Sequence, residues 1–100
     1  MILDTREWID LPFAERIKRR RRILLDGVEQ HQVWYVDTED SDPKNHFIRT
    51  YDVLGDGMWH TMTDLQRRGI EIKEDWDNID GIASKTLFGA VTMKDYDAKP

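Results

Sequence analysis

The stretch "ERIKRRRRILLDG", residues 15–27, places six cations in a chain whose formal net charge is −5. Pro12 suits the first turn of a helix, and Gly27 suits the left-handed residue that ends one. We therefore predict a helix over 12–26. At 100° per residue its apolar side chains form one stripe that would face the core, made of Phe13, Ile17 and Leu24 with Ala14 and Leu25 on its flank.

The cations of this predicted helix fall into two groups. Lys18, Arg19 and Arg22 lie opposite the stripe and form a candidate basic contact face. Arg20 and Arg21 lie beside or within the stripe, where each must extend along its stem to water or meet a carboxylate. Four consecutive arginines spread over about 300° of the helix surface, so the run does not make one continuous phosphate-binding face. We expect a solvated helix face first and a contact surface second.

The rest of the chain predicts an α+β fold, with the N-terminal basic helix packed on a small antiparallel β-sheet and one further short helix. Asp4 and Glu7 have the capping-box spacing and predict a short helical turn. Strands are expected over 28–38, 46–54, 70–75 and 85–93. A helix is expected over 62–69, capped by Thr61 or Thr63 and ended by Gly69. Turns or loops are expected at 39–45, "GDG" (55–57) and "WDNIDG" (76–81).

Two of these assignments leave an alternative open. Asn45 could cap a helix over 46–54, and Ser84 could cap one over 85–93. We treat 1–100 as a single domain: an N-terminal segment (1–11), the basic helix, a mostly antiparallel sheet over 28–93 with the short helix near 62–68, and a tail (94–100).

Charge is unevenly distributed along the chain. Residues 1–27 hold seven cations and five acids, a net of +2, whereas residues 28–100 hold eight cations and fifteen acids, a net of −7. An acidic body attracts basic protein surfaces and repels phosphate at long range. The simpler explanation is that net acidity keeps a small protein soluble.

Composition excludes several classes of protein. The absence of cysteine excludes a disulfide framework, thiolate zinc sites and a cysteine nucleophile. The N-terminus "MILDTREWID" lacks a basic region and a long apolar run, so we expect no signal peptide. No apolar run approaches the roughly 20 residues of a membrane span. We therefore expect a cytoplasmic protein with no membrane partner.

No motif for catalysis or for a cofactor stands out. His31, His46 and His60 are fourteen or fifteen residues apart, too far for a local metal-binding pair. "DWDNIDG" begins like a calcium loop, but Thr86 occupies the position that requires Glu. The chain has no glycine-rich phosphate loop and no serine nucleophile motif. We predict that the protein is not an enzyme and binds no metal or cofactor.

An aromatic and acidic surface is the second candidate contact region. Neighbouring residues of a strand point to opposite faces, so Trp34 or Tyr35 would lie away from the main core. Trp and Tyr are frequent anchors of protein interfaces. Together with two acidic stretches, the candidate residues are Trp34, Tyr35, Asp37, Glu39, Asp40, Asp42, Glu74, Asp75 and Asp77.

Residues 56–72, "DGMWHTMTDLQRRGIEI", resemble the segment of winged-helix domains that leads into the second helix. The residues that carry the resemblance are Asp56, Gly57, Trp59, His60, Thr61, Leu65, Arg68, Gly69 and Ile70. It implies a helix over 46–54 and a DNA-reading helix after residue 70. Residues 71–80 depart from that pattern, because they hold five acids against Lys73 alone and would be repelled by phosphates.

These observations favour a small non-enzymatic interaction protein that binds another macromolecule, and the expected partner is a protein. A regulator or inhibitor of the kind encoded by phages and mobile elements, acting through an acidic surface, fits the description. The alternative is a nucleic-acid-binding accessory module, either winged-helix-like or acting through the arginine-rich helix. The sequence leaves the oligomeric state open.

Overall fold

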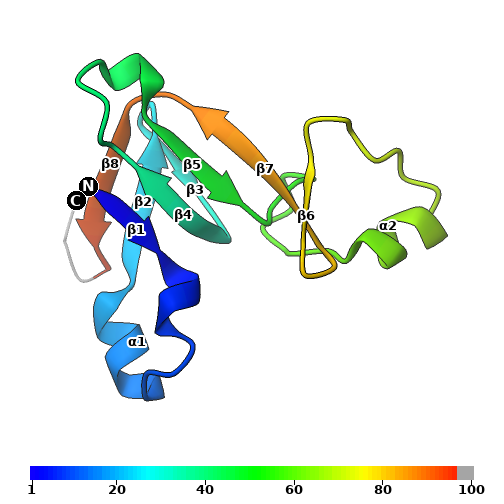
Figure 1. Cartoon of the computed structure of the whole chain (residues 1–100), viewed down its shortest axis with the longest axis horizontal. Coiled ribbons are helices and arrows are strands. Elements are labelled where there is room, and N and C mark those ends of the chain that lie inside the picture. Colours follow the sequence, from blue (N-terminus) through cyan, green and yellow to red (C-terminus); the bar gives the residue numbers. More distant parts are fainter. Residues whose placement is uncertain (97–100) are drawn as a thin grey trace.

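The computed structural model describes residues 1–96, which form a small α+β fold of two antiparallel sheets and two short α-helices (Figure 1). The strands are β1 (Ile2–Asp4), β2 (Arg21–Leu25), β3 (Val28–Gln30), β4 (Val33–Asp37), β5 (Phe47–Thr50), β6 (Asp77–Ile79), β7 (Ile82–Phe88) and β8 (Val91–Asp95). The helices are α1 (Phe13–Arg19) and α2 (Met62–Arg67), with 3-10 turns η1 (Thr5–Trp8) and η2 (Pro43–Asn45).

The larger sheet has the strand order β1-β4-β5-β7-β6, and the smaller has the order β3-β2-β8. The main core lies where the two sheets pack together. Ile23 of β2 meets Val36 of β4 and Ile48 of β5, and all three side chains are buried. The β-branched residues of these strands suit a pleated, packed surface, which explains why they form strands.

The predicted basic helix over 12–26 is wrong in its second half. The helix covers only Phe13–Arg19, Arg20 follows it in an extended conformation, and Arg21–Leu25 form strand β2. Asp26 and Gly27 both have positive φ, at 50° and 83°, and join β2 to β3 in a tight hairpin. An Asp-Gly pair between apolar residues is a strong signal for such a turn. Gly27 is therefore left-handed as expected, but it closes a hairpin and does not end a helix.

A second, smaller core lies at the far end of the larger sheet. Val53 and Leu65 pack with Ala83 of β7, and Met62, Ile70, Ile72 and Trp76 surround them. The prediction of α2 is confirmed, since Thr61 caps it by accepting a hydrogen bond from the Asp64 amide at 3.1 Å. Gly69 follows it with φ of +73°. Figure 1 shows α1 and α2 at widely separated places in the fold.

Several other predictions need correction. The expected strand over 70–75 is irregular chain, and the short strand β6 lies within the stretch expected to be a loop. The "GDG" stretch joins β5 to α2 and is not a hairpin turn. The region 28–38 is split into β3 and β4 by Gln32, which has φ of +55°. The region 85–93 is likewise divided between β7 and β8, and part of the predicted tail (97–100) lies outside the described residues.

Strand β5 resolves the open alternative at 46–54 in favour of a strand. The winged-helix arrangement is therefore wrong, since it needs a helix there and another after residue 70. The described chain has β5 and β6 in those places. The short helical turn predicted after Asp4 is confirmed as η1, because the Asp4 carboxylate accepts a hydrogen bond from the Arg6 amide at 3.0 Å.

Candidate functional site

The candidate site is a groove between η1 and α1, which lie next to each other at one end of the fold (Figure 1). Asp4 caps η1, and its carboxylate also pairs with the Arg6 guanidinium at 2.9 Å. The Arg6 side chain holds the pKa of Asp4 below its ordinary value. Pro12 directly precedes α1, which begins at Phe13. The groove has a volume of about 460 Å³ and is lined by Thr5, Arg6, Trp8, Ile9, Phe13, Arg16, Ile17 and Arg20.

The apolar side chains that line this groove are exposed to solvent. Ile9 is 77% exposed, Phe13 is 70% exposed and Ile17 is 48% exposed. Phe13 and Ile17 are four residues apart and share one helix face, as the apolar stripe predicted. The prediction that this stripe builds the core is wrong, since neither α1 nor η1 contains a buried residue. Because α1 ends at Arg19, its apolar stripe is short and does not extend to the sheet.

The rim of the groove is cationic. Arg16 lies over the ring of Phe13, with its guanidinium carbon 5.9 Å from the ring centre. Arg20 similarly lies 5.4 Å from the ring centre of Tyr96. Within residues 1–96, neither arginine has a carboxylate at ion-pair distance. The groove therefore combines an apolar floor with two cations that lack a counter-ion in the described chain.

The other cations of the run are mostly paired. Of Arg20 and Arg21, which were expected to need a carboxylate or to extend to water, Arg21 forms an ion pair with Asp95 at 2.8 Å. Lys18 contacts Glu15 on its own helix at 3.5 Å. Arg22 contacts Glu29 at 2.8 Å, which raises the pKa of the guanidinium and lowers that of the carboxyl.

The basic face predicted for Lys18, Arg19 and Arg22 does not form as one helix face. The helix ends at Arg19, and Arg22 belongs to strand β2. Part of that face would also be neutralised, because Lys18 and Arg22 each have an acidic partner. A binding role for these three residues stays a prediction.

The acidic and aromatic candidate surface is divided by the fold. Trp34 is only 2% exposed, and its indole Nε1 donates a hydrogen bond to the buried Ser84 hydroxyl at 2.8 Å. It is therefore a core residue and not an accessible anchor, whereas Tyr35 remains half-buried. The two neighbours do not simply alternate, because the register of β4 against β5 shifts between Val33 and Tyr35.

The predicted acidic residues lie in two separate places. One group follows β4, where the carboxylates mainly shape the loop: Asp37, Asp40 and Asp42 each accept a hydrogen bond from a nearby backbone amide. Glu39 contacts the terminal amino group at 2.9 Å. The other group, Glu74, Asp75 and Asp77, lies beside and within β6 at the opposite side of the larger sheet (Figure 1). The structure does not bring the two groups together.

The histidines also remain apart. His46 contacts the Asp40 carbonyl oxygen at 2.6 Å, and His60 contacts the Asp56 carboxylate at 2.8 Å. His31 lines a separate cavity between the two sheets. Within residues 1–96, no group of three or more potential ligands is placed to hold a metal ion.

Sequence reasoning missed Ile9 and Arg20 as site residues and assigned Phe13 and Ile17 to the core. The signal that could have found them is the Asp26-Gly27 pair. Read as a hairpin, it forces the preceding residues into a strand and leaves room for only about two helical turns. A stripe of two apolar residues on so short a helix buries little area.

Comparisons with known proteins give no family for this chain: no protein-family model, no curated protein and no solved structure matches it. In the part of the chain that the structure describes, neither helix has the length and apolar character needed to cross a bilayer.

Proposed function

We propose that this chain is a non-enzymatic interaction protein, and that its groove between η1 and α1 binds an acidic, partly apolar segment of a partner protein. The observation that carries the proposal is the exposure of Phe13 and Ile17 on one face of α1. Fully burying one such side chain contributes roughly 1.5–3 kcal/mol. A partner that covers this face buries these side chains, and the complex is stabilised by that free energy.

Charge complementarity selects an acidic occupant. Arg16 and Arg20 border the groove and have no acidic partner within residues 1–96. Guanidinium groups form bidentate hydrogen bonds with carboxylates, which gives both affinity and orientation. A segment with an aromatic or aliphatic residue flanked by Asp or Glu matches the floor and the rim together.

The shape and the charge of the chain favour a protein over the other anionic surfaces. A groove accepts a protruding side chain, whereas a bilayer presents a broad, even surface. Residues 28–100 carry a net charge of −7, which opposes an extended anionic surface such as a bilayer or a duplex more than a short acidic segment that reaches only the cationic rim. A symmetric dimer through this groove would place the same cations opposite each other, so a second copy is a poor occupant.

The test selects peptides from a random displayed library against the folded protein. We expect the enriched peptides to combine aromatic or aliphatic residues with Asp or Glu. Phe13→Ser should weaken their binding by at least about tenfold, as loss of an interface anchor does. The matched control is Phe88→Ser, because Phe88 is 63% exposed but lies at the end of β7, outside the groove.

Enrichment of basic peptides, or an equal loss of affinity in both variants, would overturn the proposal. Binding of the protein to vesicles that contain anionic lipid is measured in parallel, and so is its binding to duplex DNA. If either binds saturably and Phe13→Ser abolishes that binding while no peptide is selected, the groove serves a membrane or a nucleic acid. The regulator or inhibitor role expected from the sequence stays a prediction until the partner is identified.

A further inference from the structure

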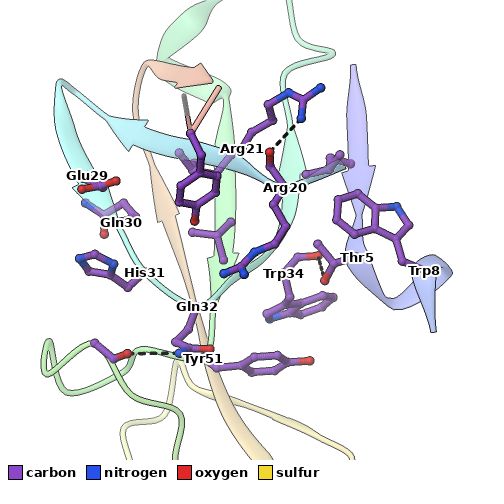
Figure 2. Close-up of a pocket in the computed structure, with 15 residues that line it drawn as sticks. Thr5, Trp8, Arg20, Arg21, Glu29, Gln30, His31, Gln32, Trp34 and Tyr51 are labelled. Carbon is purple, nitrogen blue, oxygen red and sulfur yellow. Dashed lines mark hydrogen bonds between the residues drawn. The ribbon is translucent and has the colours of Figure 1, made fainter. Parts of the chain in front are cut away.

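A second cavity lies between the two sheets, beside the groove between η1 and α1, and shares Thr5, Trp8 and Arg20 with it. Its volume is about 310 Å³, at the lower end of the range of about 300–1,000 Å³ for small-molecule sites. Side chains from β1, η1, β2, β3 and β4 converge on it. Figure 2 shows Trp8 and Thr5 on one side, Glu29, Gln30 and His31 on the other, and Trp34 with Tyr51 below.

Arg20 reaches into this cavity. In Figure 2 its side chain extends away from the backbone of the α1–β2 junction, and the guanidinium group ends in the space between His31 and Trp34. Its backbone is fixed from both sides. The Arg20 amide donates to the Ile17 carbonyl at 3.2 Å, and the Arg20 carbonyl accepts from the Arg21 guanidinium at 2.8 Å.

The charge of Arg20 is not balanced within the cavity. Glu29, the only carboxylate among the lining residues, is already paired with Arg22 at 2.8 Å. Arg21, the other lining arginine, is paired with Asp95. Within residues 1–96, Arg20 therefore presents a guanidinium with no acidic partner, and five donors in a fork that matches an oxyanion.

Trp8 and Tyr51 are half-buried and supply accessible aromatic surface to the cavity, whereas Trp34 is 2% exposed and lies under the Arg6 guanidinium at 4.4 Å. Tyr51 stacks on Trp34, with ring centres 5.6 Å apart and planes 16° apart. Burial raises the pKa of the Tyr51 phenol, so it stays protonated as a hydrogen-bond donor. Gln32 uses its amide nitrogen to donate to the Gly57 carbonyl at 3.2 Å, which leaves the amide oxygen of its side chain as an acceptor.

From this arrangement we infer that the cavity binds a small organic anion, whose phosphate or carboxylate group contacts Arg20 and whose planar part lies near Trp8 and Tyr51. One guanidinium beside a short aromatic wall fits a single anionic group on a small planar molecule. This site adjoins the groove between η1 and α1, since Thr5, Trp8 and Arg20 line both, but the Arg20 guanidinium lies in the cavity.

The experiment titrates the full chain with matched pairs of charged and neutral probes: AMP against adenosine, and benzoate against benzamide. Two-dimensional ¹H–¹⁵N spectra follow the Arg20 Nε–H and the Trp8 indole signals. We expect saturable shifts of both signals with AMP or benzoate, and at least tenfold weaker binding of the neutral member of that pair. Inorganic phosphate tests whether the anionic group alone binds.

Arg20→Gln should weaken binding of the charged probe by about 10- to 100-fold, the range expected for loss of a charge-assisted hydrogen bond. Arg19→Gln is the matched control, because Arg19 lies next in sequence but lines neither cavity nor groove. An unchanged Trp34 indole signal in the free protein shows that each variant is folded. If Arg20→Gln fails to fold, Arg20→Lys takes its place, since it keeps the charge and loses the fork.

The inference is overturned if no charged probe gives a saturable shift, if charged and neutral probes bind equally, or if Arg19→Gln weakens binding as much as Arg20→Gln. Phe13→Ser separates this site from the peptide groove. It should leave binding of the charged probe unchanged, because Phe13 does not line the cavity. Loss of peptide binding with intact anion binding would confirm that the two sites are distinct.

Discussion

The two α-helices within residues 1–96 are both short, yet they differ in what covers their apolar face. Leu65 of α2 is completely buried and forms the centre of the smaller core. Phe13 of α1 is 70% exposed, and α1 has no buried residue at all. Helices of six or seven residues are not stable alone in water. α2 is held by its packing, whereas α1 is held by the chain on either side of it.

The N-terminal ends of the two helices also differ, because only α2 has a side-chain cap. The Thr61 side chain caps α2, while Pro12 precedes α1 without a side-chain hydrogen bond. A helix that packs on its own core and carries its own cap contributes to folding. A helix that has neither and displays a stripe of apolar residues is better explained by binding.

The largest effect is expected from Leu65→Ala. Removing a fully buried leucine side chain leaves a cavity among Val53, Ala83 and their neighbours. We expect a loss of about 2–5 kcal/mol in the free energy of unfolding. Urea denaturation followed by tryptophan fluorescence measures it. A loss below about 1 kcal/mol would mean that the smaller core collapses around the gap, and that α2 is less firmly packed than its burial indicates.

The capping of α2 gives an intermediate effect. Thr61→Ala removes the side chain that accepts a hydrogen bond from the Asp64 amide, and we expect a loss of about 1 kcal/mol in the free energy of unfolding. Thr63→Ala is the matched control, because Thr63 is exposed within the helix and does not cap it. Equal losses in the two variants would show that the cap contributes nothing beyond helix propensity.

The sequence predicts α2 better than α1, because the sequence signals for α2 lie next to it in the chain. The signals of α2 are local, since Thr61 precedes the helix and Gly69 follows it, and both acted as predicted. The end of α1 was not predicted, because a left-handed glycine suits a helix end and a hairpin equally well. Pairing of β2 with β3 and β8 decides between them, and the partners in β8 lie more than sixty positions away in the sequence.

The candidate site was less predictable than the fold. The stripe of Phe13 and Ile17 is visible in the sequence, but whether it faces the core or solvent depends on the path of the chain after Arg19. The cavity around Arg20 joins residues from five strands and turns, so no local pattern marks it. Trp34 was predicted to be a surface contact residue but is buried, and the shift in the register of β4 against β5 beside it was not predictable from local sequence.

A third prediction concerns acid, and its expected effect on stability is smaller. In the loop before α2, the Asp56 carboxylate accepts hydrogen bonds from the Met58 amide at 3.0 Å and from His60 at 2.8 Å, and these contacts hold the pKa of Asp56 below its ordinary value of 3.8. The stabilisation is therefore fully present above pH 3.8 and is lost as the pH falls through the lower pKa of the folded protein.

Asp56→Asn tests this directly. Denaturant unfolding of the variant at a series of acidic pH values should show a shallower loss of stability below pH 3.8 than the parent chain does. Asp75→Asn is the control, since Asp75 is also exposed and accepts no hydrogen bond from another residue within residues 1–96. If both variants follow the pH profile of the parent, the loop contacts of Asp56 do not persist in solution.

The smallest effect on stability is expected from Phe13→Ser, and it is the most informative for the comparison. Because Phe13 is exposed and packs on no core residue, the free energy of unfolding should change by less than about 0.5 kcal/mol. Urea denaturation measures this change alongside Leu65→Ala. A loss of about 2 kcal/mol or more would show that α1 packs on the chain in solution, as α2 does, and that its apolar face is not free for a partner.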